Sequence, residues 1–376
     1  MRVVTIVGTR PELIKLSRVI AEFDISFDHV LVHTGQNFDW ELNGIFFKEM
    51  SIRKPDHFLE AHADTPSATV ARVIEKTDAL LGELRPDAML LLGDTNSCLA
   101  AYPAKRRKIP IFHMEAGNRC FDLRVPEEIN RRIVDHLSDI NLTYSEHARR
   151  YLLAEGLRPD SVMVTGSPMR EVLEYYKDAI TASPMPQALG LEPGRYFVWS
   201  THREENIDDA ASLGKLVSAL GMLVATWGLP VIFSVHPRTR QRLAKLGAEL
   251  PDLVQQHKPF GFFDYIRLQQ HALCTLSDSG TLTEESSLLN FPAVMLRQAH
   301  ERPEGMDEAT VIMSGLDPER IKSAVQMAVR HQESVPLRPF RLVPSYEPTD
   351  VSRKVARIVA SYVDYVNRTN WRKIVC

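Results

Sequence analysis

The chain has 376 residues and a formal net charge of −3, with 44% hydrophobic and 25% charged residues. This length predicts two domains of ordinary size, and the composition is typical of a globular protein. The small negative charge argues against nucleic acid or an anionic membrane as the main partner, because both favour a strong basic excess.

The four cysteines are scattered and form no C-x-x-C pair. This argues against a zinc site or a disulfide framework and is typical of a reducing compartment. The N-terminal apolar run is short, and no stretch approaches the roughly 20 apolar residues of a membrane span. We therefore expect a cytoplasmic protein with no membrane partner.

Short apolar runs alternate with longer amphipathic segments in the first half of the chain. The runs are typical of buried parallel strands and cover residues 3–7, 29–32, 88–92, 109–113, 140–143 and 162–165. The expected helices between them include residues 12–22, 69–84, 127–137 and 146–155. This alternation predicts an α/β domain with a doubly wound, Rossmann-like parallel sheet over residues 1–179.

Residues 180–194 hold three prolines without clear periodicity, which predicts a linker. The pattern then restarts, and residues 195–350 are expected to form a second doubly wound domain. Its expected strands are 196–200, 231–235, 274–277 and 293–296, with a helix at 210–226. A last helix at 351–366 either ends this domain or returns to the first. Two such domains would face each other across a cleft, where ligands bind beyond the strand ends.

The first strand leads into Gly8-Thr9-Arg10-Pro11-Glu12. This turn lacks the G-x-G-x-x-G pattern of nicotinamide dinucleotide sites. Arg10 and Lys15 lie near the start of the following helix, a combination that suits a diphosphate. A tight turn with solvated charges is the alternative interpretation.

Carboxylates follow the next strands of the first domain. Asp94 and Glu115 come at two strand ends, and Glu127 begins a helix. Several carboxylates in one site suit acid–base chemistry, although capping by Asp94 and a dipole partnership for Glu127 are alternatives. His113-x-Glu115 lacks the P-C-x-x-C partner of a zinc deaminase, so we discard that function.

In the second half, His202 and His236 stand at the ends of two expected strands. A third strand runs into Ser279-Gly280, small residues that bring backbone N–H groups close to an anion. Thr281 and Glu284 match a capping box at the next helix.

Further along, Glu285 can reach a ribose diol, and Arg302 supplies another cation. No D-x-D metal motif is present in the sequence.

Six motifs, in this order, resemble those of the non-hydrolysing UDP-GlcNAc 2-epimerase family. They are Gly8-Thr9-Arg10-Pro11-Glu12, Gly93-Asp94-Thr95, His113-Met114-Glu115-Ala116-Gly117, Pro126-Glu127-Glu128-x-Asn130-Arg131, Asp278-Ser279-Gly280 and Glu301-Arg302-Pro303-Glu304. The resemblance implies a glycosyltransferase-B type fold, a homodimer, and a UDP-sugar held in the cleft. It implies no nicotinamide and no metal cofactor.

The resemblance also assigns roles by position. The expected catalytic group is Asp94, Glu115, Glu127 and His202. The expected UDP-binding residues are Arg10, Lys15, His202, Tyr265, Ser279, Gly280, Glu285 and Arg302, with a plain packing role as the alternative for Tyr265. Thr281 stands where the family usually has a second glycine.

Residues 118–125 form a shorter segment than in the typical family member. Together with residues 132–136 and 145–151, they are similar to a capsule and O-antigen branch of the family. That branch converts UDP-2-acetamido-2,6-dideoxy-L-talose to UDP-N-acetyl-L-fucosamine. The resemblance therefore favours this 6-deoxy sugar, with the UDP-GlcNAc/UDP-ManNAc pair as the alternative substrate.

Inversion at C2 of a UDP-sugar removes a proton that no adjacent carbonyl acidifies. Loss of UDP together with this proton gives a glycal, and UDP re-adds after the proton returns to the opposite face. Cations would stabilise the departing diphosphate, and acid–base groups would serve both faces. A hydrolysing epimerase, a glycosyltransferase of the same fold and a non-catalytic nucleotide-sugar sensor are the rival interpretations.

Overall fold

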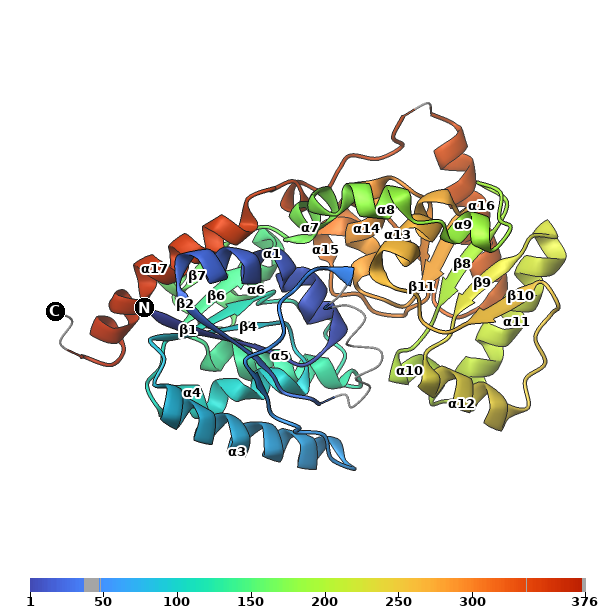
Figure 1. Ribbon diagram of the computed structural model, residues 1–376. Coiled ribbons are helices and arrows are strands. Elements are labelled where there is room, and N and C mark those ends of the chain that lie inside the picture. Colours follow the sequence, from blue (N-terminus) through green and yellow to red (C-terminus); the bar gives the residue numbers. More distant parts are fainter. Residues whose placement is uncertain (37–46, 48, 336, 374–376) are drawn as a thin grey trace. The chain divides into compact units, whose positions relative to one another are not determined.

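A computed structural model describes residues 1–36, 47, 49–335 and 337–373, and the chain divides into two compact units (Figure 1). The first unit comprises Met1–Glu174 and Glu347–Cys376, and the second comprises Tyr175–Tyr346. Each unit contains one parallel β-sheet flanked by helices.

Among the described residues, the sheet of the first unit has seven strands in the order β3-β2-β1-β4-β5-β6-β7. The strands are β1 (Arg2–Val7), β2 (Asp28–His33), β3 (His57–Phe58), β4 (Ala88–Leu92), β5 (Ile111–Met114), β6 (Ile140–Thr143) and β7 (Val162–Val164). The six strands predicted for this half are confirmed to within two residues at each end. The prediction missed β3 because a two-residue strand carries no periodic signal.

The helices of the first unit lie on both faces of its sheet. They are α1 (Arg10–Ser26), α3 (Pro66–Leu84), α4 (Ala101–Arg106), α5 (Pro126–Leu137), α6 (Glu146–Ala154), α7 (Met169–Tyr175) and α17 (Val351–Thr369), with short 3-10 turns η1 (Asn96–Ala100) and η2 (Pro159–Ser161). Val4 and Ile6 of β1 share one core with Val73 and Leu80 of α3. This alternation of side chains along β1 leaves its other face to further helices.

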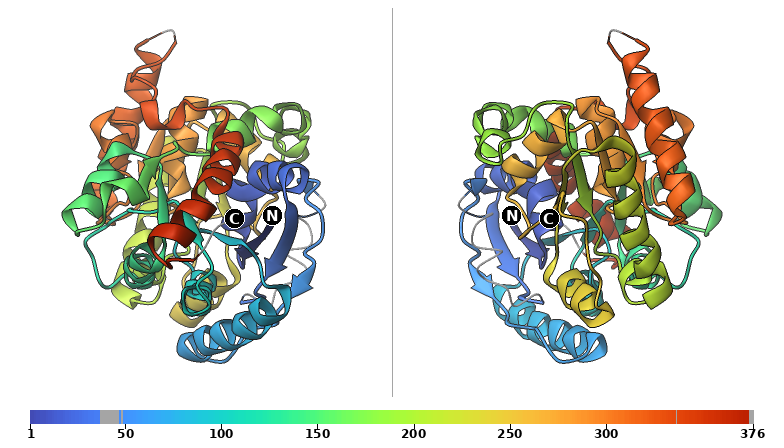
Figure 2. Two further views of the ribbon diagram at one scale, coloured as in Figure 1. Left: turned by 90° about the vertical axis from the view of Figure 1, so that its left-hand side faces the viewer. Right: turned by 90° about the vertical axis from the view of Figure 1, so that its right-hand side faces the viewer.

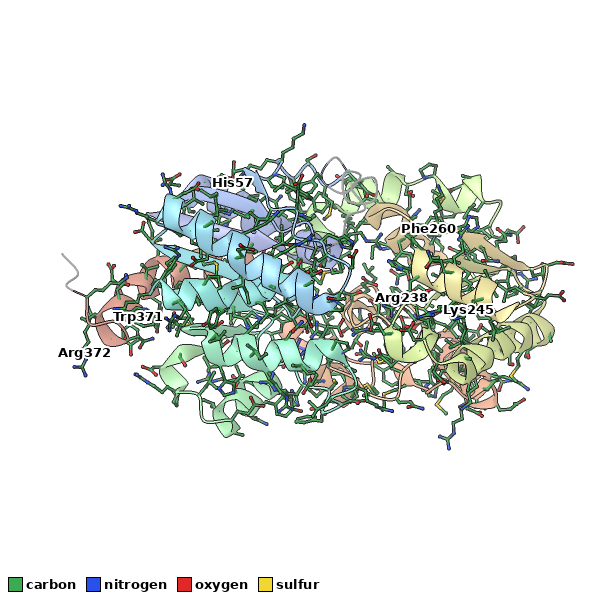
Figure 3. All side chains as sticks on the ribbon, turned by 90° about the horizontal axis from the view of Figure 1, so that it is seen from below. His57, Arg238, Lys245, Phe260, Trp371 and Arg372 are labelled. Carbon is green, nitrogen blue, oxygen red and sulfur yellow. The ribbon has the colours of Figure 1, made fainter. Side chains whose placement is uncertain are left out.

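The last helix, whose position the sequence left open, lies on the first unit. α17 packs against α1, and Figure 2 shows the two helices side by side. Val355, Val359 and Val363 of α17 are buried at i, i+4 and i+8, which is the spacing of one helix face. Beyond α17, Trp371 (Figure 3) lies 5.3 Å from Nζ of Lys105, measured to the ring centroid.

Among the described residues, the sheet of the second unit has six strands in the order β10-β9-β8-β11-β12-β13. They are β8 (Phe197–Ser200), β9 (Val231–Ser234), β10 (Val254–His257), β11 (Cys274–Ser277), β12 (Ala293–Met295) and β13 (Ile312–Met313). The four predicted strands are confirmed. The prediction missed β10 and β13, one a polar strand at the sheet edge and the other only two residues long.

The helices of the second unit are α8 (Lys177–Ala182), α9 (Met185–Ala188), α10 (Glu204–Ile207), α11 (Ala210–Trp227), α12 (Pro237–Leu246), α13 (Phe262–His271), α14 (Thr281–Leu289), α15 (Pro303–Asp307) and α16 (Pro318–Glu333), with the 3-10 turn η3 (Pro344–Tyr346). Phe197 and Trp199 of β8 pack in the core that holds α11 and α16. Tyr196 and Val198 point the other way and join Leu268 of α13.

Residues 180–194 differ from the expected open linker. They include the end of α8 and the whole of α9, and both helices pack against α13. Ile180 is buried, and the Ser183 hydroxyl donates to Asp264 Oδ1 at 2.6 Å. Two of the three prolines, Pro184 and Pro186, stand at the start of α9, where a missing N–H costs nothing.

Among the described residues, α11 is the one helix whose length and composition would also suit a membrane span. Its leucines Leu213, Leu216, Leu220 and Leu223 are buried against the sheet of the second unit. This packing accounts for one apolar face of α11, and 28% of the helix is buried.

Candidate active site

The strand order of the first unit reverses between β1 and β4, the position where doubly wound sheets bind ligands. Glu12 ties the two strand ends together there. Its Oε2 accepts the backbone N–H groups of Gly8 at 2.8 Å and Thr9 at 2.7 Å, and its Oε1 accepts the Thr95 hydroxyl at 2.9 Å. Burial raises the pKa of Glu12 to about 7, although these hydrogen bonds act in the opposite direction.

Thr9 and Glu12 form a capping box at the start of α1. This capping box was not predicted, although the Thr-x-x-Glu pattern is present in the sequence. Gly8 is required at this turn because an added Cβ would lie 1.8 Å from Ser97 Oγ and 2.4 Å from Thr34 Oγ1. Arg10 begins α1 and is partly exposed. The turn is therefore held from inside by buried contacts.

Lys15 and Glu115, expected in different roles, form an ion pair. Nζ of Lys15 lies 2.5 Å from Oε2 of Glu115, and their side chains are only 5% and 11% exposed. Glu115 occupies the left-handed region with φ of +62°, which is uncommon for a residue other than glycine. Asn118 Nδ2 donates to Glu115 Oε1 at 3.3 Å. Lys15 therefore neutralises Glu115 as well as standing near the start of α1.

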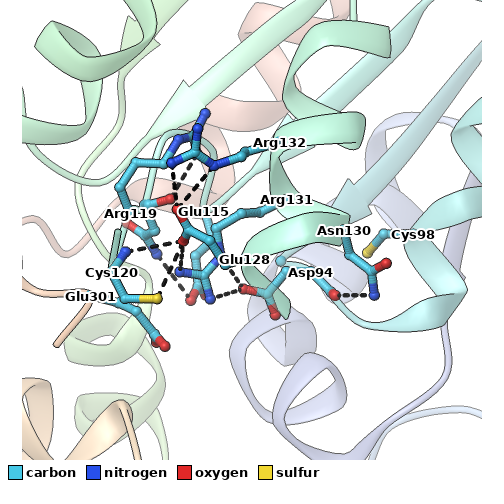
Figure 4. Close-up of polar contacts among 12 residues, drawn as sticks. Asp94, Cys98, Glu115, Arg119, Cys120, Glu128, Asn130, Arg131, Arg132 and Glu301 are labelled. Atoms are coloured by element: carbon cyan, nitrogen blue, oxygen red, sulfur yellow. Dashed lines mark hydrogen bonds and ion pairs between the residues drawn. The ribbon is translucent and has the colours of Figure 1, made fainter. Parts of the chain in front are cut away.

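Asp94 is held by Arg131 of α5, as Figure 4 shows. Nη2 and Nε of Arg131 lie 2.7 and 2.9 Å from Asp94 Oδ2, and Asn130 Nδ2 donates to the Asp94 carbonyl at 3.0 Å. The cap of the following 3-10 turn is Thr95, so the capping alternative for Asp94 does not apply. Asp94 therefore stands at the end of β4 as a carboxylate with a cationic partner.

Glu127 and Glu128 are neighbours with different environments. Glu128 is fully buried and accepts from the Cys120 backbone N–H at 3.0 Å and from Arg132 Nη2 at 2.9 Å (Figure 4). Glu127 lies in the first turn of α5 and is partly exposed. Of the two, Glu127 has the side chain that a ligand can reach.

A buried network centred on Asp135 of α5 holds the segment that carries Glu115. Asp135 accepts from His113 Nδ1 at 2.9 Å, from Arg119 Nη1 at 2.7 Å and from the Gly117 backbone N–H at 3.2 Å. The second ring nitrogen of His113 lies 2.7 Å from the Gly93 carbonyl, next to Asp94. This network was not predicted from the sequence, because its partners are distant along the chain.

The second unit has an equivalent reversal between β8 and β11. His202 follows β8, and Asp278 follows β11. Nδ1 of His202 lies 3.1 Å from Oδ1 of Asp278, and the backbone N–H groups of His202 and Arg203 donate to the same carboxylate. Asp278 belongs to one of the six motifs in the sequence, but no role was predicted for it. The side chain of His202 is 45% exposed, so its ring is accessible.

Tyr265 of α13 lies at the same strand ends. Its hydroxyl is 2.8 Å from Ser200 Oγ, which is in turn 2.7 Å from Ser277 Oγ. Ser200 and Ser277 are register partners on β8 and β11. The structure therefore brings Tyr265 to the C-terminal ends of β8 and β11, next to the segment that carries His202.

The turn after β11 differs from the expected capping box. Gly280 is the N-cap of α14 and Thr281 is the first helical residue, with no side-chain cap. Thr281 Oγ1 lies 3.0 Å from Ser279 Oγ, and Glu284 is buried against Arg302 Nη2 at 3.2 Å. The capping-box prediction for Thr281 and Glu284 was wrong because Glu284 pairs with a cation from another part of the chain.

Two further expected UDP-binding residues are buried. Glu285 accepts from Gln269 Nε2 at 2.9 Å, and Arg302 contacts Glu284 in the interior of the second unit. Ser279 and Gly280 are partly exposed at the start of α14. Among the described residues, no group of three or more His, Cys, Asp or Glu side chains is arranged to hold a metal ion.

The family model described as UDP-N-acetylglucosamine 2-epimerase matches residues 21–360. The chain belongs to this family. It is therefore an enzyme of the UDP-sugar 2-epimerase type, and its two parallel-sheet α/β units confirm the predicted glycosyltransferase-B-like fold class.

Known proteins similar to this chain differ in their sugars. A structure of UDP-N-acetylglucosamine 2-epimerase from Rickettsia bellii is 51% identical, with a TM-score of 0.90, over 99% of this chain and 100% of that one. The Methanocaldococcus jannaschii UDP-GlcNAc 2-epimerase in complex with UDP-GlcNAc and UDP is 28% identical, with a TM-score of 0.89, over 96% and 100%. A UDP-2,3-diacetamido-2,3-dideoxy-D-glucuronate 2-epimerase from Pseudomonas aeruginosa is 34% identical over 80% of this chain and 84% of its own length.

Proposed function

We propose that this enzyme inverts C2 of a UDP-linked N-acetylamino sugar by eliminating UDP and adding it back. The observation that carries the proposal is the position of two carboxylates in a member of this family. Asp94 and Glu115 follow β4 and β5, which are hydrogen-bonded neighbours in the sheet. Acid–base groups at adjacent strand ends suit a reaction that removes and returns a proton.

In the elimination, a base takes the C2 proton and the C1–O bond breaks. The C2–H electrons form the C1=C2 double bond of a glycal, and the C1–O electrons leave with UDP. In the return step, C2 receives a proton on its opposite face and a UDP oxygen bonds to C1. Atoms and electrons balance without an oxidant, because no hydroxyl is oxidised along the way.

The roles follow from charge and accessibility. Asp94, Glu115 and Glu127 would exchange protons with the sugar, while Arg10 would stabilise the diphosphate. Lys15 sits against Glu115, so its positive charge favours an ionised Glu115. In the second unit, His202 would assist the diphosphate or the proton transfer, and Tyr265, Ser279 and Gly280 would contact UDP.

We propose UDP-2-acetamido-2,6-dideoxy-L-talose as the substrate and UDP-N-acetyl-L-fucosamine as the product. The support is the segment of residues 118–125, anchored by Arg119 and by the backbone N–H of Cys120. It exposes two apolar side chains, Phe121 at 65% and Leu123 at 68%. A 6-deoxy sugar carries a methyl group where UDP-GlcNAc carries a hydroxymethyl group, and apolar contacts favour the methyl.

A single labelling experiment tests the reaction and the sugar. The enzyme is incubated in D2O with each UDP-sugar, and the products are followed by NMR. Deuterium at C2 with UDP still attached supports epimerisation, whereas free UDP indicates hydrolysis. No label without an acceptor indicates a transferase or a sensor. Faster labelling of UDP-GlcNAc than of the 6-deoxy-L-talose compound would replace the proposed substrate by the UDP-GlcNAc/UDP-ManNAc pair.

Variants test the carboxylates. Glu115→Gln and Glu127→Gln should each abolish turnover while UDP binding, measured by calorimetry, stays within about threefold. Glu146→Gln is the matched control, since Glu146 is also a first-turn glutamate but is exposed on α6. Normal turnover in both variants would disprove the assignment.

The homodimer implied by the family resemblance is tested separately by sedimentation.

A further inference from the structure

The carboxylate of Asp278 is fully buried and is surrounded by donors from the neighbouring strand end. It accepts the backbone N–H groups of His202 at 3.0 Å and Arg203 at 3.0 Å, and Asn206 Nδ2 at 3.1 Å. The His202 ring adds an ion-pair contact, with Nδ1 lying 3.1 Å from Oδ1. A buried carboxylate is tolerated only with partners of this kind.

The charge on Asp278 is retained at all physiological pH values. Burial alone would raise the pKa of this carboxyl, but the nearby His202 ring and the donors from Arg203 and Asn206 lower it to about 2. An ionised carboxylate only accepts hydrogen bonds. A lone pair on Nδ1 at 3.1 Å from this charge would be repelled, so the contact favours a proton on Nδ1.

A fixed proton on Nδ1 determines what the other ring nitrogen can do. In the neutral ring, Nε2 is then the lone-pair acceptor, and protonation turns it into a donor. The His202 side chain is 45% exposed while Asp278 is fully buried, so Nδ1 faces the protein interior and Nε2 is the accessible end. The ring cannot flip without giving up its contact with a buried charge.

We propose that Asp278 is a positioning residue that fixes the tautomer and orientation of His202, so that Nε2 is presented to the UDP-sugar. The inference rests on the proposed function only in taking His202 as a residue that meets the substrate. It goes beyond a structural link between β8 and β11, because the backbone N–H contacts alone would make that link. The contact with Nδ1 has no role in joining the strands.

The test compares Asp278→Asn with Thr239→Val as a matched control. Thr239 donates its hydroxyl to the Thr201 carbonyl at 2.8 Å, so the control loosens the same turn without touching the His202 ring. Nitrogen-15 NMR of the histidine side chains reports the tautomer, with the His202 signals assigned from their loss in His202→Gln. Turnover and its pH profile are measured with the UDP-sugar that the wild type epimerises.

The wild type should show a protonated Nδ1, and added UDP should shift the Nε2 signal. Asp278→Asn should move the proton towards Nε2, lower kcat about 100-fold or more and change its pH profile, while KM and UDP affinity stay within about threefold. Thr239→Val should keep the wild-type tautomer and pH profile. Asp278→Ala removes the acceptor altogether, so its kcat should be no higher than that of Asp278→Asn.

Four results would overturn the inference: a wild-type His202 protonated on Nε2, an Nε2 signal insensitive to UDP, an unchanged kcat in Asp278→Asn, or equal losses in the control. The tautomer of His202 and the response of its Nε2 signal to UDP are measured on the wild type, so they can be obtained even if a variant does not fold. If no UDP-sugar is labelled at C2 by the wild type, the proposed function fails. The tautomer and UDP titration still decide the Asp278–His202 relationship in that case.

Discussion

The ammonium of Lys15 lies 2.5 Å from Oε2 of Glu115, 100 residues further along the chain. Both side chains are almost completely buried, and the Lys15 ammonium also lies 5.7 Å from the centre of the Tyr144 ring. The pair connects the first helix of the first unit with the end of β5. Lys15 therefore acts on a carboxylate, in addition to the phosphate role expected of it.

Replacement of Lys15 by Met should remove the cation that lies 2.5 Å from the buried Glu115 carboxylate. We expect a loss of about 3 kcal/mol in the free energy of unfolding and a severe loss of turnover. The double variant Lys15→Met/Glu115→Gln should recover most of the stability, because both charges of the pair are then removed. Urea denaturation of the wild type, both single variants and the double variant measures the free energies of unfolding for this double-mutant cycle. Additive losses in the double variant, or weakened UDP binding with kcat intact, would instead favour a purely phosphate-binding Lys15.

Glu12 should make the first unit less stable as the pH rises. Its folded pKa of about 7 exceeds the unfolded value of about 4.5, so between these values the folded chain holds a proton that the unfolded chain has lost. Ionisation of Glu12 therefore does not change the free energy of unfolding below about pH 4.5, and it lowers this free energy by about 3 kcal/mol above pH 7. Glu12→Gln, which keeps an acceptor for Gly8 and Thr9, should flatten this slope in urea melts from pH 4.5 to 8. An unchanged slope would contradict the prediction.

His113 should contribute stability that is lost in alkali. Burial alone would lower its pKa, but Asp135, the Gly93 carbonyl and Asp94 outweigh burial and raise it above 6.5. A histidine with a raised folded pKa contributes fully below the unfolded value, and its contribution disappears as the pH rises through the folded value. Thermal melts of wild type and His113→Gln should therefore differ most near pH 6 and converge above the folded pKa. A gap that stays constant across this range would argue for packing alone.

Gly117 should tolerate no side chain. It has φ of +79°, and an added Cβ would lie 2.5 Å from the backbone oxygen of Ala148, which cannot move away. Gly156 has φ of +90° with open space around it, so Gly156→Ala isolates the conformational cost of about 1 kcal/mol. Gly117→Ala should cost about 3 kcal/mol because overpacking is added. Equal unfolding free energies for the two variants would refute the close contact.

Much of the fold was predictable because burial on both faces of a parallel strand leaves an apolar run in the sequence. Val3, Leu90 and Val231 belong to such runs, and each lies in a strand of the structure. Residues 254–257, Val-Gln-Gln-His, form the edge strand β10 and carry no such signal. The strand ends were predictable for the same reason, and with them the places of Asp94, Glu115 and His202.

The same Thr-x-x-Glu pattern occurs at two helix starts with opposite outcomes. Thr9 and Glu12 form a capping box, whereas Glu284 turns away from Thr281 to pair with Arg302. Local sequence offers both possibilities, and the choice depends on whether a cation reaches the carboxylate from elsewhere in the fold. A charge-assisted contact in the interior stabilises the fold more than a side-chain cap does. The backbone N–H groups that lose the cap can bond to another acceptor.

By itself, the sequence determined the alternating strands and helices and the polar residues at the strand ends, because both follow from burial along short segments. Only the tertiary structure decided the partners of those residues: Glu115 with Lys15, Asp94 with Arg131, and His202 with Asp278. Each pair joins residues far apart in the chain, and the attraction between their charges depends on a distance and a degree of burial that folding alone sets.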